Sequence, residues 1–219
     1  MKKKALFVAA IAVCILGLIS AGTMAWFNSR DSISSDFHVA TSEDHSPEDI
    51  FSVDVYEMVN SQKEQVGQVY QGVLPGSVLA KAPVVENTGR YSQWVRVKVT
   101  FSDARAWLSL MAEGVDLRSM LNMSSDWTYS SAVENTADNK VTYVFYLNRA
   151  LDVDETVATF TTVTIPTALT KELAYSIGSF TVDVVAEALQ YDNLNSDTLN
   201  TAKKAFESVG WMDNMDGIG

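Results

Sequence analysis

Residues 94–101 read Trp94-Val95-Arg96-Val97-Lys98-Val99-Thr100-Phe101, and this stretch decides the fold class. Apolar and polar residues alternate strictly from Val95 to Phe101. Successive side chains of a strand point to opposite faces of a sheet, so this alternation predicts a strand with one buried face. We expect the three valines and Phe101 in the core, and Arg96, Lys98 and Thr100 facing water.

Similar patterns predict further strands on both sides of this stretch. They are expected at 51–55, 66–73, 78–85, 127–129, 141–147, 156–165 and 180–190. Turn sequences separate them, notably Leu74-Pro75-Gly76-Ser77 and Glu86-Asn87-Thr88-Gly89, in which proline presets one dihedral angle and glycine tolerates positive φ.

Two regions have helical rather than strand spacing. One covers about 102–122 and is interrupted at Gly114; the other covers about 196–209, with Ser196 as its cap. Because helices do not alternate regularly with the strands, a parallel sheet is not indicated. The predicted fold is all-β with short helical insertions: an antiparallel β-sandwich, jelly-roll or immunoglobulin-like.

Residues 1–25 have the order of a secretory signal peptide. Three lysines precede an apolar run over 5–19, and small residues follow. Thr23 and Ala25 suit a signal peptidase, which accepts small side chains there, so Trp26 is expected to begin the mature chain. The alternative is an uncleaved anchor, for which the run is short. We expect a secreted protein that meets the membrane only before cleavage.

Residues 26–40 carry an alternating pattern of their own. The odd positions include Phe27, Ile33, Phe37 and Val39, whereas the even positions from 28 to 38 are polar and Trp26 is an exception. This predicts an amphipathic strand. Residues 41–49, with four acidic side chains and one proline, are expected to link it to a sandwich domain over 50–219. A strand on a flexible connector is free to pair outside its own domain.

Composition and missing motifs exclude several function classes. The formal net charge of −11 disfavours nucleic acid as a partner. The single cysteine, Cys14, lies in the signal, so the mature chain has no disulfide or thiolate metal site. The two histidines, His38 and His45, lie in the N-terminal segment, and no metalloprotease, phosphate-loop or nucleophile-elbow motif occurs. We expect no enzyme, no catalytic residue, no metal and no cofactor.

The signal junction and several short motifs resemble the TasA/camelysin family of Gram-positive exported proteins. Residues 22–28, GTMAWFN, are similar to the boundary that a dedicated SipW-like signal peptidase cuts in that family. The family's P-G, N-T-G, V-R-V-K-V and A-x-A-[IL]-Q series is matched in order. The matching residues include Pro75, Gly76, Asn87, Thr88, Gly89, Arg96 and Gln190.

The resemblance implies a jelly-roll-like sandwich that assembles into extracellular fibres of a biofilm matrix. The N-terminal strand of one subunit would complete the sheet of the next, so the partners would be copies of this chain or a homologous fibre subunit. Two other functions stay open: a non-polymerising surface adhesin or minor fibre-anchoring component, and a camelysin-type surface metalloprotease. The second lacks a recognisable zinc-ligand set in the sequence.

Overall fold

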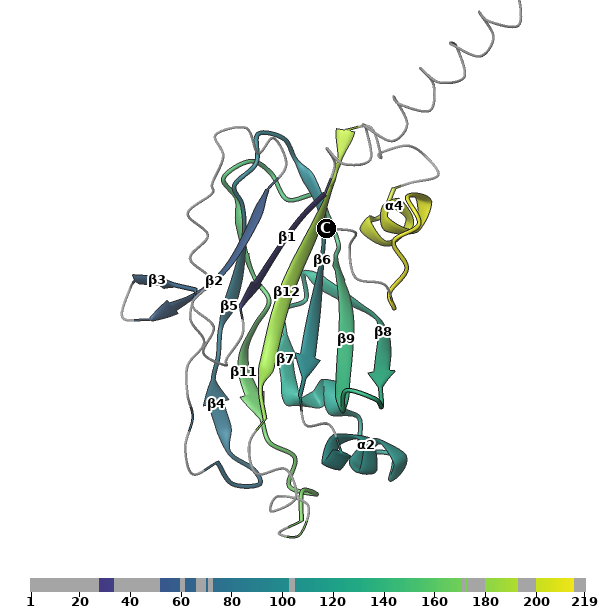
Figure 1. The fold of residues 1–219 in the computed structure, drawn as a ribbon. Coiled ribbons are helices and arrows are strands. Elements are labelled where there is room, and N and C mark those ends of the chain that lie inside the picture. Colours follow the sequence, from purple (N-terminus) through teal and green to yellow (C-terminus); the bar gives the residue numbers. More distant parts are fainter. Residues whose placement is uncertain are drawn as a thin grey trace, which may run out of the picture.

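The order of the strands makes this protein a two-layered antiparallel structure (Figure 1). The computed structural model describes residues 28–33, 52–59, 62–65, 70, 73–102, 105–170, 172, 180–192 and 200–214. These residues form three antiparallel sheets with a few short helices, which confirms the predicted all-β sandwich.

The first layer is a five-stranded sheet. Its order is β1 (Asn28–Ile33), β12 (Val182–Gln190), β6 (Gln93–Phe101), β9 (Lys140–Leu147) and β8 (Trp127–Asn135). Strand β6 contains the alternating stretch on which the fold prediction rests, and it lies at the centre of the sheet. Of the described strands in this layer, β1 and β8 are the two edges.

The second layer is made of two smaller sheets that continue into each other. One has the order β10 (Thr156–Ala158), β5 (Pro83–Asn87), β2 (Val53–Val59) and β3 (Gln62–Glu64). The other has the order β4 (Val78–Ala80), β11 (Phe160–Thr164) and β7 (Leu121–Met123). Backbone hydrogen bonds from Lys81 to Thr161 and from Thr159 to Pro83 bridge them, so the two form one bent layer.

The core lies between the two layers. Val95, Val97, Val99 and Phe101 of β6 are fully buried there, as the alternation predicts. Opposite them, Val53, Val55 and Val85 of the second layer belong to the same apolar cluster. Burying apolar surface of this kind is the main stabilising contribution in a chain whose expected mature form has no disulfide.

The helices are short and lie at the ends and outside of the sandwich. In the region expected to be helical over 102–122, α2 (Arg105–Ala112) is followed by a 3₁₀ turn, η1 (Leu117–Met120). Gly114, with φ of +87°, separates them, as predicted. In the region expected over 196–209, α4 (Ala202–Ser208) begins after Thr201, whose side chain caps it; the expected cap Ser196 lies outside the described residues.

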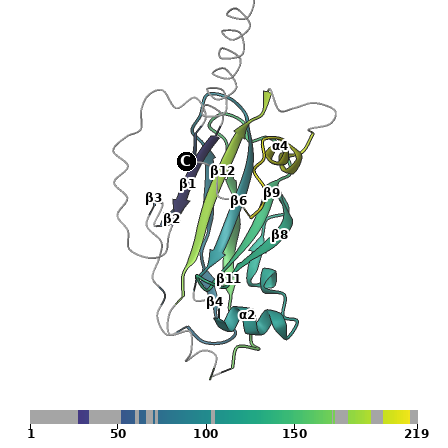
Figure 2. The same cartoon turned by 45° about the vertical axis from the view of Figure 1, so that its right-hand side comes forward.

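The expectation that Arg96, Lys98 and Thr100 face water is wrong. Arg96 is fully buried, Lys98 is buried, and Thr100 is half-buried with its hydroxyl 2.9 Å from that of Thr142. Arg96 is covered by α4 and the residues after it, which pack against the outer face of β6 and β9 (Figure 2). Lys98 lies beside the buried Glu187, with its Nζ 3.4 Å from the carboxylate. A second apolar cluster forms beneath this cover, from Trp94, Val144, Tyr146, Leu189, Ala202, Ala205, Phe206 and Trp211.

Arg96 joins β6, β12 and the C-terminal segment. Its Nε donates to Oε2 of Glu187 on β12 at 2.6 Å, and both side chains are fully buried. Its Nη1 donates to the carbonyls of Trp211 and Met212 at 2.9 and 3.2 Å. The guanidinium also lies 4.6 Å from the ring centroid of Phe206. The buried charge is thus paired and hydrogen-bonded, as its burial requires.

Replacing Arg96 with alanine is expected to lower the free energy of unfolding by about 3–5 kcal/mol, because it leaves the buried Glu187 carboxylate without its closest cation. The matched control is Arg118→Ala. Arg118 is half-exposed and paired with the exposed Asp116, so its loss is expected to cost about 1 kcal/mol or less. Urea unfolding at neutral pH measures both, and equal losses would contradict this role of Arg96.

Candidate functional site

The edge of the five-stranded sheet where β1 meets β12 is the first candidate site. Six residues of β1 pair antiparallel with β12, from Asn28 opposite Leu189 to Ile33 opposite Val184. The other side of β12 pairs with β6 over nine residues. Strand β1 also lies beside β2 of the second layer, so it closes one side of the sandwich (Figure 1).

The candidate donor-strand residues fall only partly within the described chain. Ile33 ends β1, opposite the fully buried Val184. The signal-cleavage residues Thr23, Ala25 and Trp26, and the donor-strand residues Phe27, Phe37 and Val39, lie outside the described residues. Of the strand expected over 26–40, the structure therefore describes only residues 28–33.

The Asn87-Thr88-Gly89 turn anchors the point where the chain enters the second layer. The carbonyl of Ser52, one residue before β2, accepts hydrogen bonds from the amides of Thr88 and Gly89 at 3.0 and 3.1 Å. It also accepts from the side-chain amide of Gln93 at 2.9 Å. Three donors thus hold the first described residue after the expected linker.

The side chain of Asn87 holds this turn together through hydrogen bonds. Its Nδ2 donates to the carbonyls of Tyr91 and Leu151, both at 2.9 Å, and its Oδ1 accepts from Gly89 and from the side chain of Gln93. The residue is fully buried. A shorter or apolar side chain would remove these four hydrogen bonds from a buried turn, so the N-T-G sequence has a structural role here.

The other motif residues also hold the backbone in place. Gly76, with φ of +82°, follows Pro75 in a turn and donates its amide to the carbonyl of Ile165 at 2.9 Å, which ties β4 to the end of β11. Gln190 is buried at the end of β12, opposite Gln93. Arg96 binds the C-terminal segment, as described above. These residues lie in separate parts of the sandwich and do not converge on one cavity.

A carboxylate fastens the C-terminal segment to the sheet. Asp213 accepts hydrogen bonds from the hydroxyls of Ser130, Ser131 and Tyr146 at 2.7, 2.6 and 2.6 Å. Burial by itself would raise the pKa of this carboxyl, but the three hydroxyls favour the charged form and the pKa is lowered overall. The pKa of the Tyr146 phenol is raised, chiefly by burial and next by this hydrogen bond.

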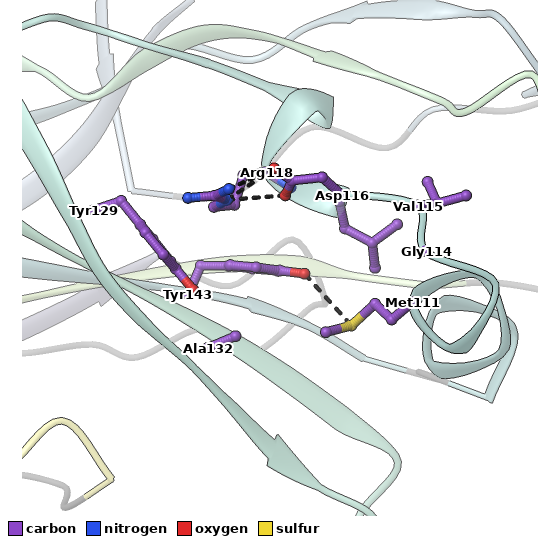
Figure 3. Close-up of a pocket in the computed structure, with 9 residues that line it drawn as sticks. Met111, Gly114, Val115, Asp116, Arg118, Tyr129, Ala132 and Tyr143 are labelled. Carbon is purple, nitrogen blue, oxygen red and sulfur yellow. Dashed lines mark hydrogen bonds and ion pairs between the residues drawn. The ribbon is translucent and has the colours of Figure 1, made fainter.

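A pocket of about 260 Å³ lies between the α2–η1 connection and strands β8 and β9 (Figure 3). Arg118 makes bidentate hydrogen bonds to Asp116, and its guanidinium carbon lies 4.2 Å from the ring centroid of Tyr129. The hydrogen bond from Arg118 is the main reason that the pKa of Asp116 is lowered. Tyr143 and Met111 complete the wall, with the phenol oxygen 3.6 Å from the sulfur.

The charged groups that line this pocket, Asp116 and Arg118, pair with each other. Burial raises the pKa of the Tyr143 phenol, which makes it a poorer acid. Within the described part of the chain, no group of three or more His, Cys, Asp or Glu residues lies close enough to hold a metal ion. The same part of the chain contains no helix long and apolar enough to span a membrane.

Sequence reasoning did not predict the partners of Glu187 and Ser52. The alternation over 180–190 predicts a strand, and Ser52 falls inside the strand expected over 51–55. Neither role has a local sequence signal, because each depends on residues distant in the chain: Arg96 for Glu187, and Asn87-Thr88-Gly89 for Ser52. Comparison with protein-family models, with curated proteins and with solved structures finds no match to this chain.

Asn87→Ala is expected to lower the free energy of unfolding by about 1–3 kcal/mol, since it removes four hydrogen bonds in a buried turn. It should also speed hydrogen exchange at the amides of Thr88 and Gly89, which close onto Ser52. The control Asn135→Ala removes an exposed turn asparagine that bonds Asp138, and should change stability by less than about 1 kcal/mol. Unchanged exchange at Gly89 would contradict the anchoring role.

Asp213→Asn should reduce stability at neutral pH and make no difference in acid. The folded-state pKa of Asp213 is lowered, so its carboxylate contributes stability above the ordinary value of 3.8. That contribution is lost as the pH falls through the folded-state pKa. Unfolding midpoints of both proteins, measured from neutral pH to below about pH 3, should therefore converge on the acid side. A difference that stays constant with pH would show that Asp213 does not act through its charge.

Proposed function

We propose that this protein is a secreted structural subunit that assembles head-to-tail into extracellular matrix fibres by donating its N-terminal strand. The observation that carries the proposal is the position of β1. It is the last strand of its sheet, pairs with β12, and precedes a long connector to a firmly anchored residue, Ser52. The resemblance of the signal junction and motifs to the TasA/camelysin family points the same way.

The β12 edge requires a strand. Without β1, the backbone N–H and C=O groups along this side of β12 would lose the partners that the observed pairing gives them. A strand edge of this length, next to fully buried side chains such as Val184 and Ala186, readily accepts an added strand from another chain. The same edge can thus be completed by the chain's own N-terminal strand or by that of a second copy.

The connector is long enough for exchange. Ile33 lies opposite Val184, whereas Ser52 bonds to Gln93, which lies opposite Gln190. Six residues of strand separate these two levels, which is about 20 Å. Residues 34–51, fully extended, reach about 60 Å. The length in excess of what self-pairing needs allows β1 to reach a neighbouring molecule.

Exchange of this kind produces filaments. The donated strand and the recipient edge are different surfaces of the subunit, so each added molecule presents a new recipient edge or a new donor strand. Such a contact does not close on itself unless the rotation between subunits forms a ring. The expected signal peptide would keep the donor strand at the membrane until export, and signal peptidase would release it.

One observation favours a second function. In the described structure β1 pairs with β12 of its own chain, so a single molecule has a completed sheet. A chain that stays in this form would be a non-polymerising surface component, such as an adhesin or a minor fibre-anchoring protein. The two functions differ in whether β1 leaves its own sheet.

Negative-stain electron microscopy of two purified chains tests the proposal. The chain beginning at Trp26 is expected to form fibres, and the chain beginning at Thr41, which lacks β1, is not. The shorter chain retains the β12 edge and so can accept a strand without donating one. Added in substoichiometric amounts, it should therefore cap growing ends and shorten the fibres of the longer chain.

The control for capping is the same amount of an unrelated acidic domain, which should leave fibre length unchanged. Fibres from the Thr41 chain alone would contradict strand donation. Folded monomers from both chains at high concentration would favour the surface component.

A further inference from the structure

The observed register determines which residues of β1 share a face with the core. Ser29, Asp31 and Ile33 lie opposite Ala188, Ala186 and Val184. Directly opposite residues of an antiparallel pair share one face of the sheet, and these three β12 side chains are fully buried in the core. Two of the three core-side positions of β1 are therefore polar, and one is an aspartate, which is a poor match for that face.

A shift of β1 by four residues along β12 gives a better match. An even shift keeps the same residues on the core side, whereas an odd shift would exchange the two faces. The new opposite pairs would be Ile33–Ala188, Ser35–Ala186, Phe37–Val184 and Val39–Val182. Three of the four donor residues are then apolar, and the branched Ile33 falls opposite a small alanine, as close packing of neighbouring strands favours.

The outer face and the connector favour the observed register when the chain pairs with itself. On the outer face Arg30 lies opposite Glu187, and the shift would put Ser34 in the place of Arg30. The shift would also shorten the connector to residues 40–51 while moving its start farther from Ser52. A strand from another molecule does not have to return to this Ser52. For such a strand, burying Phe37 and Val39 outweighs one cross-strand charge pair.

We infer that a second copy of this chain enters the β12 edge in the shifted register, with residues 33–39 along β12 instead of residues 28–33. The inference rests on the proposed function and specifies how its site is filled. The occupant is argued from the fully buried core-side residues of β12, from the polar residues that the self-paired register places opposite them, and from the apolar residues that follow β1. The two registers would distinguish the free subunit from the assembled one.

Disulfide cross-linking distinguishes the registers because the expected mature chain contains no cysteine. Val185, half-buried on the outer face of β12, lies opposite Ser32 in the observed register and opposite Asp36 in the shifted one. Fibres are grown from equimolar mixtures of a Val185→Cys chain with either a Ser32→Cys or an Asp36→Cys chain, and are then oxidised. The 36–185 heterodimer should exceed the 32–185 heterodimer roughly tenfold, because only opposite residues meet disulfide geometry.

A double variant, Ser32→Cys with Val185→Cys, controls for the free subunit. It should cross-link within the monomer before assembly, which verifies the observed register and shows that the Val185 substitution is tolerated. A non-reducing gel with peptide mass spectrometry identifies each product. If 32–185 heterodimers predominate in fibres, exchange occurs without the shift, and the inference is wrong while the proposed function stands. If the fibres contain neither heterodimer, both the inference and the proposed function are wrong.

A second measurement does not depend on cysteine chemistry. Phe37→Ser removes the largest apolar residue that the shifted register brings to the core but leaves residues 28–33 intact. It should reduce fibre yield at least about tenfold without changing the unfolding midpoint of the monomer. Asp36→Ser, on the outer face, is the matched control and should assemble normally. Normal assembly of the Phe37→Ser chain would contradict the shifted register.

Discussion

Strand β12 has two edges, and both need hydrogen-bond partners. One edge is paired with β6 over the whole strand, and the other is completed by six residues of β1. The first partner is central and covered on both faces, whereas the second is an edge strand on a long connector. The proposed function rests on this asymmetry.

The outer face of the sheet shows how the sandwich stays intact if β1 leaves. Arg96 binds Glu187 of β12 and also the carbonyls of Trp211 and Met212, so β6, β12 and the C-terminal segment are held together. Asp213 extends this attachment to β8 and β9 through three hydroxyls. These contacts do not use β1, as the proposed strand exchange requires.

The turn at Asn87-Thr88-Gly89 holds the other end of the connector that follows β1. Three donors around Asn87, Thr88 and Gly89 hold the carbonyl of Ser52, so the second layer begins at a fixed point. A connector that starts from a fixed point has a defined reach. The N-T-G sequence, which is a common turn signal in isolation, here holds the residue at which the second layer begins.

The sequence by itself determined the sandwich class and the core side of β6, because alternation of side chains is a local property of an extended chain. It also located the break at Gly114 and the turns at Pro75-Gly76 and Asn87-Thr88-Gly89, because these depend on the dihedral preferences of single residues. It did not separate β4 from β5 or β10 from β11, which belong to different sheets. Only the tertiary structure decided that Arg96 is buried, because the segment that covers it lies more than a hundred residues away. It likewise decided the neighbours of β12 and the register of β1, since strand pairing joins residues whose contact no local pattern records.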